Sequence, residues 1–326
     1  MDTNYLQAMN KIISDQVNQM DNTLVYGENL DRGSFISGLS KNLVAGPTRL
    51  VKNVGNCEYT HCGVGFGLMM SGKNAVLFVK QLDFMMLGID HFVSTYGSIR
   101  ATKYQQPLGS FTIVTAIYDQ GFQGPQSSFR GLSEICSMSG VSGFLLHELS
   151  DAKKIVEEEI SKPGIRFFAL SQRKASEELY VSDVIDAAID NSVIQYQRGA
   201  NVSIVCFGHA LAHGRTLASF CRDRSLTASL FSVNYVRDAK WEIAIQDVLR
   251  SKKLLIIDDT QSSTSMAFRF LADVFEFDAE VKFTVVRNRA ETSTAVSDER
   301  FNVDHEKVIT WIVSRELTQF RHNFME

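Results

Sequence analysis

Short apolar runs, each suited to a buried β-strand, alternate along this chain with stretches that suit helices. In the first half the apolar runs lie at residues 23–26, 75–79, 111–117, 143–146 and 165–170. The helical stretches lie at residues 5–20, 63–70, 84–99, 131–138 and 151–161. Alternation of this kind is typical of a parallel sheet covered by helices, so the sequence predicts an α/β fold.

A second alternating set begins near residue 200. Its expected strands are residues 202–207, 227–233, 254–257 and 281–286, and its expected helices are 210–221, 239–249, 265–274 and 305–314. The polar stretch 195–200 between the sets reads as a linker, and all four prolines fall in the first half. We therefore expect a first domain at residues 1–185, a linker at 186–200 and a second domain at 201–326.

Composition narrows the classes of protein to which the chain can belong. The formal net charge of −4 gives no basic footprint for nucleic acid. No apolar run approaches the roughly 18 residues of a membrane span. The five cysteines are an odd number without a C-x-x-C pair, and the first residues lack the regions of a signal peptide. These features favour free thiols and a cytoplasmic protein that binds neither nucleic acid nor a membrane.

One segment carries most of the chemical information. Glu58 stands at the start of an expected helix that contains Gly63 and Gly67 and is followed by Gly72, a strand at 74–79 and the run Gln81-Leu82-Asp83-Phe84. A helix N-terminus favours negative charge, and glycine lets a helix pack closely against its neighbours. Taken alone, the acid would be a helix-capping residue.

The ordered set of motifs resembles the β subunit of the decarboxylating component of 2-oxo acid dehydrogenases, a thiamine-diphosphate family. The resemblance runs nearly from end to end and rests on several short segments: Gly27-Glu28-Asn29, Glu58 with its glycines, Asp83-Phe84, Asp90-His91, Gly124-Pro125-Gln126, Ser150-Asp151-Ala152-Lys153 and Asn201–Gly208. It implies two doubly wound domains, a pyrimidine-binding domain followed by a transketolase-type C-terminal domain.

The resemblance also implies roles for five residues. Glu58 would hydrogen-bond the N1′ nitrogen of the aminopyrimidine and activate the cofactor. Phe84 would stack on the pyrimidine ring, and Gln81 would contact the cofactor from the cavity wall. Glu28 and Ser127 are weaker catalytic candidates at that wall. We expect no metal ligand in this chain.

Two departures from the family shape the expected function. Ser127 stands in the loop where the family has a histidine, and serine cannot shuttle a proton near neutral pH. The superfamily marks its diphosphate and Mg²⁺ site with Gly-Asp-Gly, a sequence that does not occur here. The resemblance therefore implies an α-type partner subunit that holds the diphosphate and Mg²⁺, in an α2β2 heterotetramer.

Several functions stay open from the sequence. As an enzyme subunit, the chain would support decarboxylation of a 2-oxo acid with acyl transfer, with or without a docked lipoyl acyltransferase. Alternatively, it would support transketolase-like carbon–carbon bond formation on a ketose. A non-catalytic scaffold that keeps the fold is the rival that Ser127 supports best. A generic nucleotide-binding protein is disfavoured, because no strand leads into G-x-G-x-x-G or a P-loop.

Overall fold

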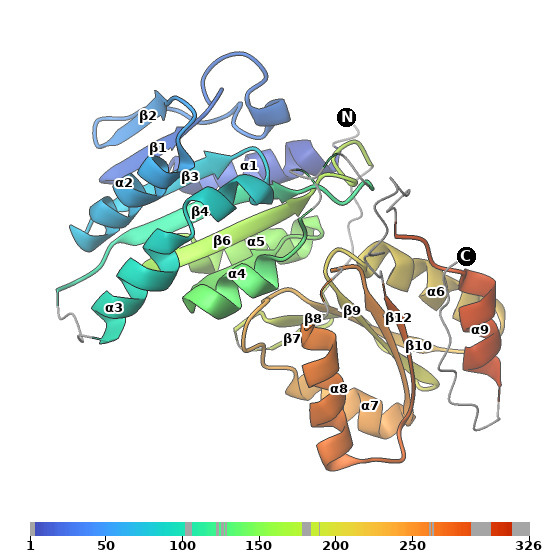
Figure 1. The fold of residues 1–326 in the computed structure, drawn as a ribbon. Helices are drawn as coiled ribbons and strands as arrows, with labels where there is room; N and C mark the ends of the chain where they lie inside the picture. The colour runs from blue at the N-terminus through green and yellow to red at the C-terminus, as the bar shows by residue number, and fades with distance from the viewer. Residues whose placement is uncertain are drawn as a thin grey trace. The chain divides into compact units, whose positions relative to one another are not determined.

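The structure is a computed structural model that divides into two compact units, Met1–Val181 and Ser182–Glu326 (Figure 1). It describes residues 4–101, 106–121, 124, 127, 129–177, 184–188, 190–260, 262, 264–287 and 301–314. Each unit is built around a six-stranded sheet. The expected α/β class, with two mostly parallel sheets and alternating helices, is therefore confirmed. Among the described residues, no helix is both long and apolar enough to cross a membrane.

The sheet of the first unit is parallel throughout, in the order β2-β1-β3-β4-β6-β5. Its strands are β1 (Thr23–Gly27), β2 (Arg49–Asn53), β3 (Asn74–Val79), β4 (Ser110–Ile117), β5 (Ser142–Leu145) and β6 (Gly164–Ser171). Strands β3, β4 and β6 are buried almost throughout, which explains their near-continuous apolar sequences. The sequence did not predict β2, because this edge strand is half exposed along its length.

Helices cover both faces of this sheet. They are α1 (Tyr5–Val17), α2 (Glu58–Met70), α3 (Tyr96–Ala101), α4 (Leu132–Ser139) and α5 (Leu149–Glu159), with the short helix η1 (Ile36–Gly38) after β1. α1 packs against α5, whereas α2 packs on β3 and β4. Right-handed crossovers place α2 and α4 on one face and α5 on the other, as Figure 1 shows.

The prediction of one continuous helical stretch at residues 84–99 is wrong. The structure has instead the 3₁₀ helix η2 (Leu82–Leu87), the π-helical turn η3 (His91–Thr95) and α3. At Gly88 the chain lies against α2 so closely that a Cβ there would overlap with the Cys62 sulfur and lie 3.2 Å from the Glu58 carbonyl oxygen. This tertiary contact, which periodicity does not reveal, separates η2 from the helical turns that follow.

The sheet of the second unit is mixed, in the order β12-β11-β9-β10-β8-β7. Its strands are β7 (Asp186–Ala187), β8 (Val193–Gln197), β9 (Val202–Phe207), β10 (Ala228–Val233), β11 (Lys253–Asp258) and β12 (Lys282–Arg287). β8 runs antiparallel to both β10 and β7. The expectation of a linker at 186–200 therefore fails, because β7 and β8 belong to this sheet. Polar residues at the end of β8 concealed a strand that is buried from Val193 to Tyr196.

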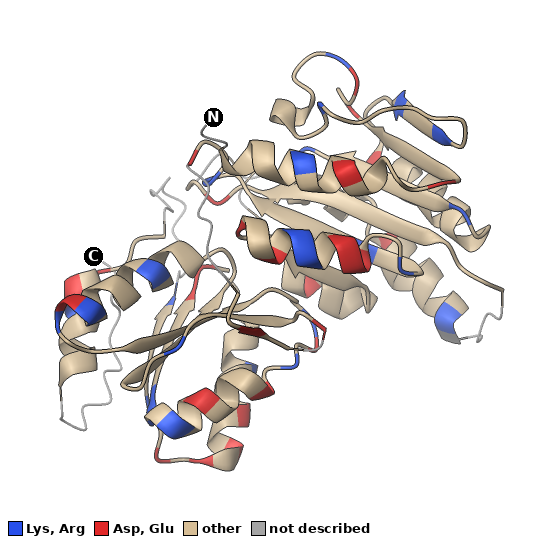
Figure 2. Ribbon diagram, turned by 180° about the vertical axis from the view of Figure 1, so that it is seen from behind, with Lys and Arg blue, Asp and Glu red and all other residues tan. Residues whose placement is uncertain are grey.

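Two cores flank the second sheet. Its helices are α6 (Leu211–Asp223), α7 (Glu242–Ser251), α8 (Met266–Phe277) and α9 (His305–Val313). α6 packs with α9 in one apolar cluster, and α7 packs with α8 in the other. Basic and acidic residues are interspersed along the helices of both units (Figure 2).

Candidate functional site

The site begins where β2 ends and the chain turns into α2. β2 ends at Asn53, and α2 begins at Glu58 after a short turn. Glu58 is only 7% exposed although it carries a carboxyl group at the start of a helix. The Asn56 side-chain amide faces this carboxylate. With the amide assigned so that its nitrogen points to Glu58, that nitrogen donates to both carboxylate oxygens over 3.2 and 3.1 Å. These donors and the positive end of the helix offset the cost of burying the carboxylate.

Glycines allow α2 to pack closely against its neighbours, but Gly65 has this role in place of the expected Gly67. A Cβ at Gly65 would overlap with the Phe111 ring and the Tyr26 hydroxyl, and a Cβ at Gly63 would lie 3.2 Å from the His91 ring. At Gly67 a Cβ would meet nothing within 4 Å. Close packing therefore depends on Gly65 and Gly63, whereas Gly67 faces open space.

Two of the other expected site residues lie together. Gln81 follows β3, is 3% exposed and donates from its side-chain nitrogen to the Ser127 hydroxyl over 3.0 Å. Ser127 lies in a turn after β4, where its backbone N–H donates to the Gly124 carbonyl over 3.1 Å. The carboxyl ends of neighbouring parallel strands thus bring these side chains together, as in many α/β sites. Pro125, Gln126 and Ser128 of this loop lie outside the described residues.

Phe84 lies one turn into η2, half-buried, and its backbone N–H donates to the Gln81 carbonyl over 3.3 Å. The preceding Asp83 accepts a hydrogen bond from the Phe129 backbone over 2.9 Å, which fastens η2 to the segment after Ser127. Through Gly88, η2 also packs on the helix that begins at Glu58. The elements that carry Phe84 and Glu58 are therefore in contact.

Glu28 is placed at the same edge of the sheet but apart from this network. It follows β1 directly, and the Gly27 carbonyl beside it accepts from the Val54 backbone over 3.1 Å. Within the described part of the chain, the Glu28 carboxylate is half-buried and has no hydrogen bond or ion pair. The structure thus links Glu58, Gln81, Ser127 and Phe84 through packed elements, without joining Glu28 to them.

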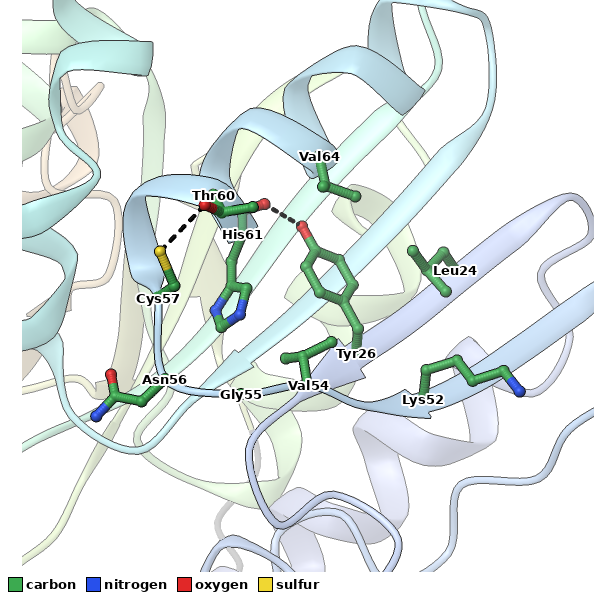
Figure 3. Close-up of a pocket in the computed structure, with 10 residues that line it drawn as sticks. All are labelled: Leu24, Tyr26, Lys52, Val54, Gly55, Asn56, Cys57, Thr60, His61 and Val64. Carbon is green, nitrogen blue, oxygen red and sulfur yellow. Dashed lines mark hydrogen bonds between the residues drawn. The ribbon is translucent and has the colours of Figure 1, made fainter.

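A pocket of about 540 Å³, which the sequence does not indicate, lies at the start of α2 (Figure 3). β1 contributes Leu24 and Tyr26 to its wall, and β2 contributes Lys52. The remaining wall is the turn at 54–57 and the first two turns of α2, which present Thr60, His61 and Val64. Residues of an edge strand and a turn line this space, which explains why apolar periodicity did not indicate it.

Tyr26 forms the floor of this pocket and joins it to α2. Its hydroxyl donates to the His61 carbonyl over 2.6 Å, and its ring meets the His61 ring edge-on with centroids 6.1 Å apart. Burial raises the pKa of this hydroxyl well above its usual value, so it stays a donor. Throughout the described ranges, the pocket included, no group of three or more His, Cys, Asp and Glu side chains is arranged to hold a metal ion.

This chain is similar to known proteins in its three-dimensional structure, whereas its sequence matches none of those compared. No family model matches the sequence, and no curated protein matches it. A solved structure described as a split-gene transketolase, an inactive β4 tetramer, is 14% identical with a TM-score of 0.67, over 94% of this chain and 95% of that one. A transketolase from Campylobacter jejuni subsp. jejuni is 11% identical with a TM-score of 0.64, over 95% of this chain but 45% of that one. The chain therefore has the two-domain fold that these transketolase structures share.

Proposed function

We propose that this chain is the β-type subunit of a two-chain thiamine-diphosphate enzyme and supplies the acid that activates the aminopyrimidine. One observation carries the proposal: the Glu58 carboxylate is buried at the first position of a glycine-packed helix, although no cation pairs with it in the described structure. The cost of burying this carboxylate is offset by the Asn56 amide and the helix N-terminus rather than by a cation. The transketolase-like fold supports the same reading.

The residues present fit one half of the cofactor. Glu58 would hold a proton shared with a ring nitrogen, and the backbone contact of η2 with α2 would keep the Phe84 ring near it. Gln81 and Ser127 would bind polar atoms of cofactor or substrate at the ends of β3 and β4. Thiamine diphosphate, when bound, supplies an electron sink for breaking or forming a bond beside a carbonyl carbon.

The other half of the cofactor needs a second chain. Diphosphate and Mg²⁺ require a few oxygen ligands, and neither Gly-Asp-Gly nor a metal cluster in the described ranges offers them. We therefore propose an α-type partner in an α2β2 assembly. The solved β4 tetramer of a split transketolase is described as inactive, which supports the expectation that the isolated β-type chain lacks activity.

Ser127 weakens one of the proposed reactions. Its hydroxyl accepts from Gln81 and cannot act as a base near neutral pH, so steps that need a loop histidine are disfavoured. Carbon–carbon bond formation on a ketose or 2-oxo acid therefore fits better than acyl transfer to a lipoyl acyltransferase. The second candidate function is a non-catalytic scaffold, and the same Ser127 favours it.

Calorimetry of thiamine diphosphate with Mg²⁺, on the chain alone and on the complex recovered from its source, is the first test. Binding by the complex alone is expected. The second test is exchange of the C2 proton, followed by NMR in that complex. Glu58→Gln should reduce the exchange rate by about 10²-fold or more, in the range of an acid–base contribution.

Glu242→Gln is the matched control, because Glu242 is also the first residue of a helix, α7. Unchanged exchange in Glu58→Gln, or equal losses in both variants, would refute the catalytic role. Absence of cofactor binding by a stable complex would favour the scaffold.

A further inference from the structure

One cysteine differs from all the others in its surroundings. Cys57 is exposed at the N-cap of α2, whereas the other four cysteines, all within the described ranges, are buried. Its sulfur lies 3.0 Å from the Thr60 hydroxyl. Hydrogen bonding by the Thr60 side chain, aided by its backbone N–H, lowers the pKa of the Cys57 thiol. Burial raises the pKa of Cys62 to about 12 and that of Cys221 to about 11.

Cys57 also lines the pocket described above, and so does His61, whose ring nitrogens make no hydrogen bond within the described residues. The His61 side chain is 8% exposed and points into the space beside Gly55 and Tyr26 (Figure 3). Its backbone bonds to Tyr26 and Cys57, but within the described part of the chain neither ring nitrogen has a hydrogen bond. A largely buried imidazole whose ring nitrogens make no hydrogen bond within the described residues is positioned to bond with a molecule in the pocket.

The charge of the pocket wall restricts what that ligand can be. No acidic residue lines the pocket, and Lys52 has no ion pair among the described residues. Leu24, Val54 and Val64 supply apolar wall between these polar groups. Lys52 lies at the opposite end of the pocket from Cys57 and His61 (Figure 3), so the lining fits an elongated small molecule that carries carboxylates.

We propose that Cys57 is a thiol–disulfide exchange site and that the adduct it forms with an anionic low-molecular-weight thiol lies in this pocket. The Cys57 thiolate attacks one sulfur of an external disulfide such as oxidised glutathione. A new sulfur–sulfur bond forms to Cys57 while the external bond breaks. The second thiol leaves with the electron pair and takes a proton from water, so the external disulfide is the oxidant. Lys52 and His61 would hold the carboxylates of the bound half.

Such an adduct would be next to the acid of the proposed site. Asn56, which donates to both oxygens of the Glu58 carboxylate, also lines the pocket. An adduct on Cys57 would therefore lie beside the Asn56 amide, because both residues line the pocket. Modification of the thiol does not require a cofactor, so the inference stands or falls separately from the proposed function.

The test measures adduct formation by intact mass and peptide mapping of the purified chain with oxidised glutathione at neutral pH. One adduct per chain is expected, at Cys57, formed about 10²-fold faster than at any buried cysteine, since reaction requires an exposed thiolate. Cys57→Ser should abolish it, while Cys221→Ser, the matched control at a buried thiol, should leave it unchanged. An adduct spread over several cysteines, or none, would overturn the proposal.

Two further comparisons test recognition by the pocket rather than reactivity alone. Lys52→Gln should slow the reaction with oxidised glutathione about threefold, as expected for one solvated ion pair, and should not slow the reaction with cystamine, which is cationic. Thr60→Val should slow both reagents at neutral pH, because it removes the hydroxyl that stabilises the thiolate. Equal effects of Lys52→Gln on the two disulfides would show that the pocket does not select the anionic thiol.

Discussion

A single methyl group added to α2 should have opposite effects at two glycines two residues apart. At Gly65 the new Cβ would overlap with Phe111 and with the hydroxyl that Tyr26 donates to the His61 carbonyl. Overpacking costs about 1–3 kcal/mol and the strained hydrogen bond about 1 kcal/mol, against a gain of about 1 kcal/mol in helix propensity. We expect Gly65→Ala to lower the free energy of unfolding of the first unit by about 1–3 kcal/mol.

Gly67→Ala is the matched control on the same helix, because its Cβ would meet nothing within 4 Å. Alanine has a higher helix propensity than glycine and lowers the conformational entropy of the unfolded chain. Gly67→Ala should therefore stabilise the first unit by about 0.4–1 kcal/mol. The free energies of unfolding of the two variants should therefore differ by about 1.4–4 kcal/mol.

Urea unfolding followed by far-UV circular dichroism, with hydrogen exchange in peptides covering 58–70, would measure this difference. Both tryptophans, Trp241 and Trp311, lie in the second unit, so their fluorescence serves as an internal reference that should not move. If Gly65→Ala proved as stable as Gly67→Ala, the argument that Gly65 sets the position of the acid-bearing helix would be refuted.

Two other changes probe contacts away from the site. The Tyr5 hydroxyl donates to the Leu146 carbonyl over 2.6 Å and accepts from the Ser171 N–H over 3.2 Å, and Tyr5→Phe would remove both bonds. Urea unfolding should show a free energy of unfolding lower by about 1–3 kcal/mol. An unchanged unfolding midpoint would contradict this expectation. Burial lowers the pKa of His305 below its usual 6.5, although Asp304 and Glu306 oppose this. The unfolded chain then binds the proton more readily, so packing of α9 on α6 is at full strength above pH 6.5 and weakens as the pH falls towards the lowered pKa. Protection of the amides at 305–313, measured relative to their intrinsic exchange rates at each pH, should fall on acidification. His305→Phe should flatten that fall, and equal profiles would exclude His305 as its cause.

The sequence predicted the elements whose burial is uniform. Strands such as Asn74–Val79 and Val202–Phe207 are apolar along nearly their whole length because both faces are covered, so composition alone reveals them. β2 and β8 lie toward the edges of their sheets, where polar residues are tolerated, and they were missed. The break after η2 depends on Gly88 meeting α2, a contact between segments that periodicity cannot show.

The candidate site was predictable to a similar extent. Glu58 stood out because an acid preceded a glycine-rich helix, and Gln81 and Ser127 followed expected strands. Asn56 was not singled out, although an amide two residues before a helix start often bonds to that end. The pocket at Lys52, Cys57 and His61 required the three-dimensional arrangement of an edge strand, a turn and a helix.

The Tyr5 hydroxyl has a consequence for how the chain is made. Its bonds reach residues 141 and 166 positions further along the sequence. At a synthesis rate of about 5–20 residues per second, the ribosome needs roughly 10–30 s between making Tyr5 and making Ser171. During that interval α1, whose buried side comprises residues such as Met9, Ile13 and Val17, has neither α5 nor β6 to cover it. Of the helices described here, α1 is made first and is thus among the last to dock, and chaperones that bind apolar helices have their longest opportunity there.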